Sequence, residues 1–165
     1  MKTYKLFSVL LILVFLAACG AKMDNTYDDV KQKVSEAQNS ITKVSVDDLK
    51  TIIDNHEEIT IIDCREEGEY INGHIPGAIN IPRGVLEFSS KVSNRRDKIY
   101  VNCRTSNRAS LACQTLKLLK YKDVYLINGG WKQWHETFPD LIEEGTGEPG
   151  GKAAPKVEES GGCGG

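Results

Sequence analysis

The spacing of apolar residues changes several times along the chain, and each change predicts a different kind of element. Residues 6–18 form an almost wholly apolar run. From residue 43 onward, short apolar runs alternate with stretches whose apolar residues recur at helical spacing. Strands and helices that alternate in this way are typical of an α/β domain with a parallel sheet and helices on both of its faces.

The predicted strands are short and rich in β-branched residues. They cover residues 43–44, 59–62, 78–81, 98–102 and 123–127. Helices are predicted after Ser45, which forms a capping-box-like pair with Asp48, then over residues 84–92 and 106–120, and in a last segment that carries Trp131 and Trp134. Residues 63–70 are predicted to lead through a short turn.

The N-terminus is predicted to lie outside the fold. Lys2 and Lys5 precede the apolar run, which is too short to span a bilayer as a helix. The run ends in Leu-Ala-Ala-Cys-Gly at residues 16–20, which resembles a bacterial lipobox. The resemblance implies that residues 1–18 are a lipoprotein signal peptide and that lipid on Cys19 anchors the exported protein to a membrane, facing the periplasm or the cell exterior. A plain secretory signal with an incidental cysteine is the alternative.

The rest of the chain is predicted to consist of three segments. Residues 19–41 are polar apart from a narrow apolar stripe of helical period, and we expect a spacer, with a partner-binding helix as the alternative. Residues 42–143 form the α/β domain. Residues 144–165 are rich in glycine and charged residues, and we expect this tail to be disordered.

Composition excludes some classes of function. The chain has 165 residues, enough for one ordinary domain, and a formal net charge of −2 without a basic run, so nucleic acid is not an expected partner. Besides Cys19, the cysteines are Cys64, Cys103, Cys113 and Cys163. None forms a Cys-x-x-Cys pair, so no zinc site is predicted, and no other metal or organic cofactor is implied.

The strongest chemical signal surrounds Cys103. A buried strand ends there, a helix opens shortly afterwards, and between them lies the polar loop of Arg104, Thr105, Ser106, Asn107 and Arg108. The loop amides, the helix N-terminus and the two arginine charges are all expected to lower the pKa of the thiol. The same groups can bind a small anion. Cys103 is therefore the predicted nucleophile, and residues 104–108 are the predicted substrate-binding loop.

Three segments together resemble the rhodanese family. Residues 63–70 followed by 73–82 are similar to the first signature of the family, residues 103–108 to its active-site loop, and residues 129–131, Gly-Gly-Trp, to its closing motif. The resemblance covers roughly residues 42–143. It implies a five-stranded parallel sheet and a sulfurtransferase activity. In this activity Cys103 would carry sulfane sulfur as a persulfide from a small, thiosulfate-like anion to a thiol, cyanide or a protein acceptor.

Two further features of the loop, its length and Ser106, bear on the substrate and on the activity. Four residues separate Cys103 from Arg108, whereas the phosphatase and arsenate-reductase branches of the family have five, so the narrower loop favours a compact sulfur substrate. Ser106 stands where family loops usually have glycine, which implies a left-handed backbone at a cost of order 1–3 kcal/mol. This departure is the main support for an alternative function, a non-catalytic module that binds or senses sulfur species.

The other polar residues near the site have structural interpretations. Asp63, Arg65 and Glu69 are expected to pair and to hold the loop that follows their strand. His74 is expected to brace the loop before Pro76, because the family uses no histidine base.

The remaining cysteines differ in their expected surroundings. Cys113 lies on the apolar stripe of its helix and is expected in the core, whereas Cys64 has no assigned role. Cys163 lies among glycines in the tail, where it is either an inert thiol or a resolving thiol that reacts with Cys103. The second option underlies a third function, that of a thiol-disulfide redox protein.

Overall fold

The computed structural model describes residues 26–145. The predicted signal peptide, the lipidated Cys19, Cys163 and nearly all of the predicted tail lie outside the described residues. Within residues 26–145, no helix is both long enough and apolar enough to cross a membrane. The chain divides into two units between Lys31 and Gln32, and the contacts described below lie within the second unit.

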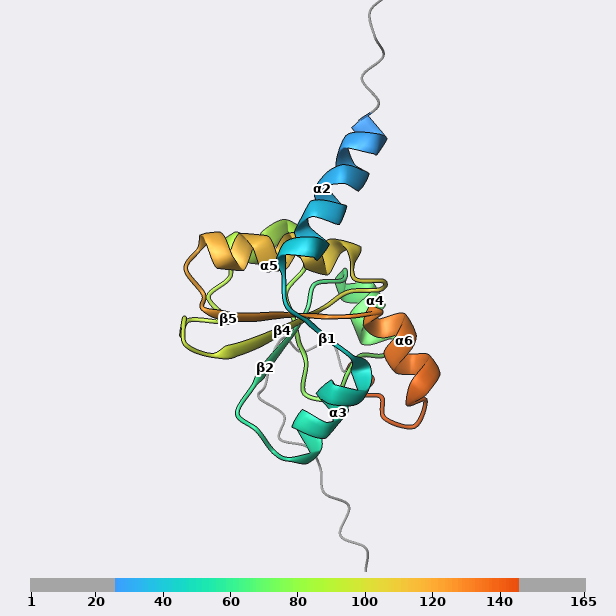
Figure 1. The fold of residues 1–165 in the computed structure, drawn as a ribbon. Coiled ribbons are helices and arrows are strands. Elements are labelled where there is room, and N and C mark those ends of the chain that lie inside the picture. The colour runs from blue at the N-terminus through green and yellow to red at the C-terminus, as the bar shows by residue number, and fades with distance from the viewer. Residues whose placement is uncertain (1–25, 146–165) are drawn as a thin grey trace, which may run out of the picture. The chain divides into compact units, whose positions relative to one another are not determined.

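The centre of the domain is a five-stranded parallel sheet with the order β1-β5-β4-β2-β3 (Figure 1). Its strands are β1 (Lys43–Val44), β2 (Thr60–Asp63), β3 (Ile79–Asn80), β4 (Lys98–Asn102) and β5 (Asp123–Ile127). The predicted bounds of β1, β4 and β5 are confirmed, β2 is shifted by one residue, and β3 is shorter than predicted. The α/β fold class predicted from the alternating pattern is therefore confirmed.

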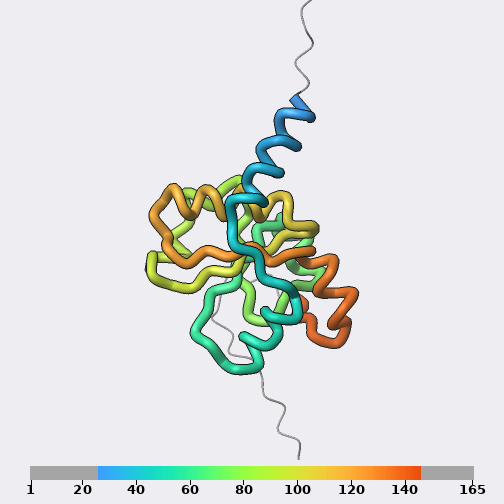
Figure 2. The backbone as a smooth tube through the Cα atoms, in the orientation of Figure 1, coloured from blue at the N-terminus to red at the C-terminus, as the bar shows by residue number. Residues whose placement is uncertain are grey.

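Helices cover both faces of this sheet. The helices of the described residues are α2 (Thr26–Ser40), α3 (Val46–Asp54), α4 (Glu67–Ile71), the 3-10 helix η1 (Arg83–Phe88), α5 (Asn107–Leu118) and α6 (Gly130–Thr137). Figure 1 shows α5 on one side of the sheet and α3 and α6 on the other. Figure 2 follows the chain as it returns to the sheet after each helix, so that all the strands run in one direction.

The two faces bury two separate apolar clusters because side chains alternate along each strand. Ile62 of β2 and Val101 of β4 pack against α5 and η1. Their neighbours Ile61 and Tyr100 point to the opposite face, where they pack against α3 and Trp134 of α6. At the N-terminus of α3, the predicted cap is confirmed, since the Ser45 hydroxyl oxygen accepts a hydrogen bond from an amide of the first turn.

Two predicted segments differ from the structure. Residues 63–70, predicted as a turn, include the first four residues of α4, a helix of only five residues that is too short to show a helical period. It is stabilised by a capping box between Glu66 and Glu69. The predicted helix over residues 84–92 is replaced by η1, which ends at Phe88. The backbone then becomes extended at Ser89, and this allows Val92 to reach the core.

The end of α2 is attached to the domain. Ala37 in its last turns is fully buried, and Ile41, just beyond the helix, belongs to the cluster under α5. In addition, the Gln38 side-chain amide donates a hydrogen bond to the Asn107 side chain at 3.1 Å. The final part of the segment predicted as a spacer therefore packs against the helix that carries the active-site loop.

Candidate active site

Cys103 lies at the base of its loop, between the end of β4 and the start of α5. The residue is 1% exposed and belongs to the same apolar cluster as Val101. The backbone N–H of Ala109, in the first turn of α5, donates a hydrogen bond to its sulfur at 3.3 Å. The thiol is thus part of the core, unlike a residue on an exposed loop, and helix α5 directs its N-terminal amides toward the thiol.

This environment lowers the pKa of Cys103 to about 6. The largest cause is a hydrogen bond from the thiol of Cys64, and further hydrogen bonds come from the backbone N–H groups of Ala109, Thr105 and Arg108, while burial acts in the opposite direction. With this pKa, roughly nine-tenths of the sulfur is thiolate at pH 7. The arginine charges, which the sequence suggested as a cause, are not among the main causes, because the hydrogen bonds reach the sulfur directly.

Arg108 binds a carboxylate of α4. Its guanidinium donates to the two carboxylate oxygens of Glu69, at 2.7 and 2.9 Å. The pair lowers the pKa of Glu69 and raises the pKa of Arg108. Glu69 was expected to pair with Asp63 and Arg65, and this expectation is wrong, since its hydrogen-bond partner is Arg108. The missed helix α4 explains the difference, since it carries Glu69 to the start of α5.

The remaining loop side chains point in different directions. Arg104 is exposed and forms no ion pair within residues 26–145. Thr105 is also exposed, and Asn107 bonds Gln38 instead of facing the thiol. A substrate anion can therefore contact the loop amides and the unpaired guanidinium of Arg104. The sequence suggested two available guanidinium groups, but that of Arg108 is paired with Glu69.

Ser106 has the left-handed backbone that its position implied. Its φ is +75°, so the predicted strain is present. Its side chain, however, has a role that the sequence did not reveal. The buried Ser106 hydroxyl donates a hydrogen bond to the carbonyl of Ile127 at 3.0 Å and so ties the loop to the end of β5. Glycine in this position would remove both the strain and this bond.

A buried ion pair holds the segment after β2. Arg65 donates from Nε to both carboxylate oxygens of Asp63, at 3.0 and 2.9 Å, and from Nη2 to one of them at 2.7 Å. The same Nη2 reaches the carbonyl of Gly73 at 2.7 Å. The guanidinium also lies 4.7 Å from the ring centroid of Trp131. Asp63 and Arg65 therefore link β2, the Gly73 turn and α6, which is a structural role.

His74 contacts groups other than the thiol. Its Nδ1–H donates to the carbonyl of Tyr70 at 3.0 Å, and its ring stacks on the Tyr70 ring with centroids 3.7 Å apart. Its Nε2 lies 3.6 Å from a carboxylate oxygen of Glu143. His74 thus fixes the loop to the end of the domain and is not placed to act as a base for Cys103.

The Gly-Gly-Trp motif closes the site from the other side. The backbone N–H groups of Trp131 and Lys132 donate to the carbonyls of Cys103 and Arg104, at 2.8 and 3.1 Å. Gly130 makes this approach possible, since its φ is +62° and a Cβ atom there would lie 2.3 Å from the Cys103 carbonyl oxygen. The N-terminus of α6 therefore fixes the loop carbonyls while the loop amides stay free to face the sulfur.

The other two described cysteines are both buried. Cys113 lies in the core as predicted, and burial raises its pKa to about 12. Cys64 is the residue that the sequence left without a role, although it contributes most to the low pKa of Cys103. The sequence placed each of these cysteines shortly after a strand, but it did not reveal that the two strands, β2 and β4, are neighbours in the sheet.

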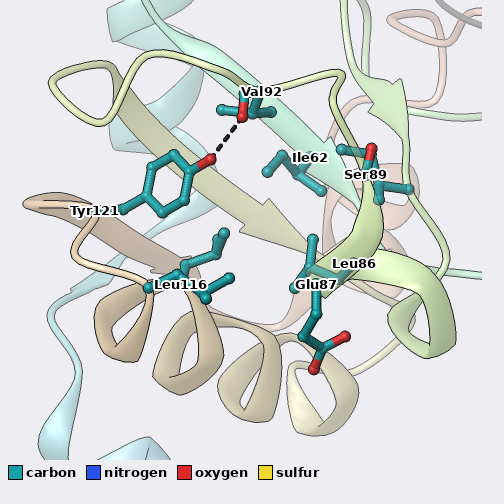
Figure 3. Close-up of a pocket in the computed structure, with 9 residues that line it drawn as sticks. Ile62, Leu86, Glu87, Ser89, Val92, Leu116 and Tyr121 are labelled. Atoms are coloured by element: carbon teal, nitrogen blue, oxygen red, sulfur yellow. Dashed lines mark hydrogen bonds between the residues drawn. The ribbon is translucent and has the colours of Figure 1, made fainter.

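The pocket in Figure 3 is separate from this site. It lies between η1, β2 and the end of α5, and Ile62, Leu86, Leu116 and Tyr121 line it. Its volume of about 30 Å³ has room for only one or two water molecules. Among residues 26–145, no cluster of three or more His, Cys, Asp or Glu side chains could hold a metal ion.

The first prediction concerns the reactivity of the thiols. Alkylation of Cys103 by iodoacetamide, followed by peptide mass analysis, is expected to reach half of its maximal rate near pH 6, because the thiolate is the reacting form. Cys113 is expected to stay unmodified in the folded protein. A Cys103 midpoint at pH 8 or above would contradict the hydrogen-bonded thiolate.

The second prediction separates the two effects at Ser106. Ser106→Ala keeps the left-handed strain but leaves the Ile127 carbonyl without its donor, so the free energy of unfolding is expected to fall by about 1–2 kcal/mol in urea titrations. Ser106→Gly also relieves the strain, so it is expected to be more stable than Ser106→Ala. An alanine variant as stable as the wild type would show that the hydroxyl contributes nothing.

Comparisons with known proteins agree with this site. Residues 45–137 match the model of the rhodanese-like domain. A relative from Bacillus subtilis (strain 168), named "Putative sulfur carrier protein YrkF", is 35% identical over 100 residues, which are 61% of this chain and 54% of YrkF. The chain spans less than two-thirds of the length of the first curated relatives that it matches.

Solved structures give the same fold. A Rhodopseudomonas palustris protein of unknown function, described as a possible tyrosine phosphatase, is 27% identical with a TM-score of 0.58, over 66% of this chain and 89% of that one. A rhodanese-like domain protein from Staphylococcus aureus has a TM-score of 0.58 at 22% identity, over 64% of this chain and 100% of that one. Since the family model covers more than half of the chain, this protein belongs to the rhodanese-like domain family.

Proposed function

We propose that this chain is a sulfurtransferase. Its Cys103 would take sulfane sulfur from a small anionic donor, such as thiosulfate, and pass it to a thiol, cyanide or a protein acceptor. The observation that carries the proposal is the position of the Cys103 sulfur at the start of α5, where it accepts a hydrogen bond from the Ala109 N–H at 3.3 Å. Hydrogen bonds of this kind lower the pKa of Cys103 to about 6. The name of YrkF as a sulfur carrier protein supports the same class of chemistry.

In the first step, the Cys103 thiolate attacks the outer sulfur of the donor. A new sulfur–sulfur bond forms, the bond inside the donor breaks, and the inner group leaves with the electron pair, as sulfite if the donor is thiosulfate. The thiolate is already ionised near neutral pH, so the step needs no base. Arg104, exposed and unpaired within residues 26–145, is placed to attract the anionic donor.

In the second step, an acceptor thiolate or cyanide attacks the outer sulfur of the Cys103 persulfide. The bond between the two sulfurs breaks, and Cys103 leaves as a thiolate. The hydrogen bonds that lower the pKa of Cys103 also make it a better leaving group. One set of donors therefore assists both halves of the reaction.

A non-catalytic sulfur-binding module is the second candidate. Its main support is Ser106, since the loop residue is usually glycine in the family. In this chain Ser106 takes up the left-handed backbone, and its hydroxyl bonds the Ile127 carbonyl, so the loop forms in spite of the substitution. This geometry favours the enzyme over the passive module.

A steady-state assay with thiosulfate and cyanide tests the proposal. We expect the wild type to produce thiocyanate, and Cys103→Ser to give no product above the blank, because a serine hydroxyl is not ionised at pH 7. Cys113→Ala is the matched control, since it removes a buried thiol from the same cluster. Activity that survives in Cys103→Ser would refute the assignment, and a wild type that binds sulfur without turnover would favour the passive module.

We also propose that the protein is exported and anchored through lipid on Cys19, on the basis of the apolar run and the lipobox-like residues 16–20. Cells that express the full chain are expected to incorporate radiolabelled fatty acid into it, and Cys19→Ser is expected to abolish the label. A secreted wild-type protein without label would reduce the proposal to simple export.

A further inference from the structure

Cys64 and Cys103 occupy equivalent places on neighbouring strands. Cys64 directly follows β2 and Cys103 directly follows β4, and these strands pair in parallel with Asp63 opposite Asn102. The pairing continues past the strand ends, since the Cys64 N–H donates to the Asn102 carbonyl at 2.9 Å. Neighbouring strands lie ~4.8 Å apart, so the two cysteines are side by side.

The side chains of the two cysteines also share one face of the sheet. Side chains alternate along a strand, so Cys64 lies on the face of Ile62, and Cys103 lies on the face of Val101. All four residues belong to the cluster under α5. Cys64 is 0% exposed and Cys103 is 1% exposed, so both thiols are shielded from water.

The backbone of Cys64 is held on both sides. Besides the bond to β4, its carbonyl accepts a hydrogen bond from the Arg83 N–H at 3.1 Å, at the start of η1. Cys64 therefore cannot move away from Cys103 without breaking hydrogen bonds to two elements. Such a residue is pre-organised to act on its neighbour.

The charges around the pair decide which sulfur is ionised. Cys103 receives the amide hydrogen bonds of α5 and its loop, whereas Cys64 lies next to the carboxylate of Asp63. The hydrogen bond to Cys103 and burial raise the pKa of Cys64 well above its usual range. Cys64 thus keeps its proton where Cys103 loses its own.

We propose that Cys64 is a positioning residue of the active site, whose S–H donates a hydrogen bond to the Cys103 sulfur and holds it as the thiolate that attacks the donor. The part that concerns turnover rests on the function proposed above. The part that concerns the thiolate does not, because a hydrogen-bonded thiolate can be measured without any sulfur transfer. Cys64 does not touch the substrate in this proposal.

The pH dependence of Cys103 alkylation in the full-length chain tests the proposal. Four variants are compared with the wild type by peptide mass analysis with iodoacetamide. Cys64→Ala and Cys64→Val remove the donor, Cys64→Ser replaces the thiol by a hydroxyl donor, and Cys113→Ala removes a buried thiol of the same cluster that bonds the Tyr125 carbonyl instead.

We expect the alanine and valine variants to raise the midpoint of Cys103 alkylation by about 1–2 pH units, since a hydrogen bond to a charged group has this magnitude. In the serine variant, the hydroxyl donor is expected to bring the midpoint most of the way back to the wild-type value. Cys113→Ala is expected to leave the midpoint near pH 6. Valine fills the space that alanine leaves empty, so one donor-free variant remains informative if the other does not fold.

A midpoint unchanged in both donor-free variants would overturn the proposal, and so would a serine variant that behaves like valine. Failure of the proposed function gives a different result. In that case the wild type makes no thiocyanate, but the midpoint of Cys103 alkylation still depends on whether residue 64 carries a hydrogen-bond donor.

Discussion

A thiolate buried in a protein core requires hydrogen-bond donors around it, because burial otherwise favours the neutral thiol. In this chain the donors come from separate parts of the sequence. Helix α5 supplies the Ala109 and Arg108 amides, the loop supplies the Thr105 amide, and the end of β2 supplies the Cys64 thiol. β2 and β4 are parallel neighbours, and this brings the parts together at the carboxyl ends of the two strands.

The charged residues near the site stabilise its framework. Asp63 pairs with Arg65 and Glu69 pairs with Arg108, so each pair adds little net charge to the site. The first pair joins β2 to the Gly73 turn, and the second joins α4 to α5. Together with the amides of α6 on the loop carbonyls, they keep the donors in position around Cys103.

Local patterns in the sequence were sufficient for the strands and for the cap at Ser45, whereas the strained backbone at Ser106 was implied by the resemblance to the family. They were insufficient wherever a residue acts through a distant partner. Glu69 of α4 pairs with Arg108 of α5, 39 positions away, and the Ser106 hydroxyl bonds a carbonyl 21 positions away. The part that Cys64 plays depends on strand order, which periodicity does not reveal. What the sequence predicts for residues 1–25 and 146–165 stays a prediction, because the structure does not describe them.

In the proposed reaction, Cys103 is the residue that carries the transferred sulfur, and a measurement of the protein's mass tests this assignment most directly. The full-length chain is incubated with thiosulfate, freed of excess donor and analysed without reductant, first intact and then as peptides. The account predicts a gain of one sulfur, located on the peptide that contains Cys103. Extra sulfur on Cys64, Cys113 or Cys163 instead, or no gain with any sulfane donor, would contradict it.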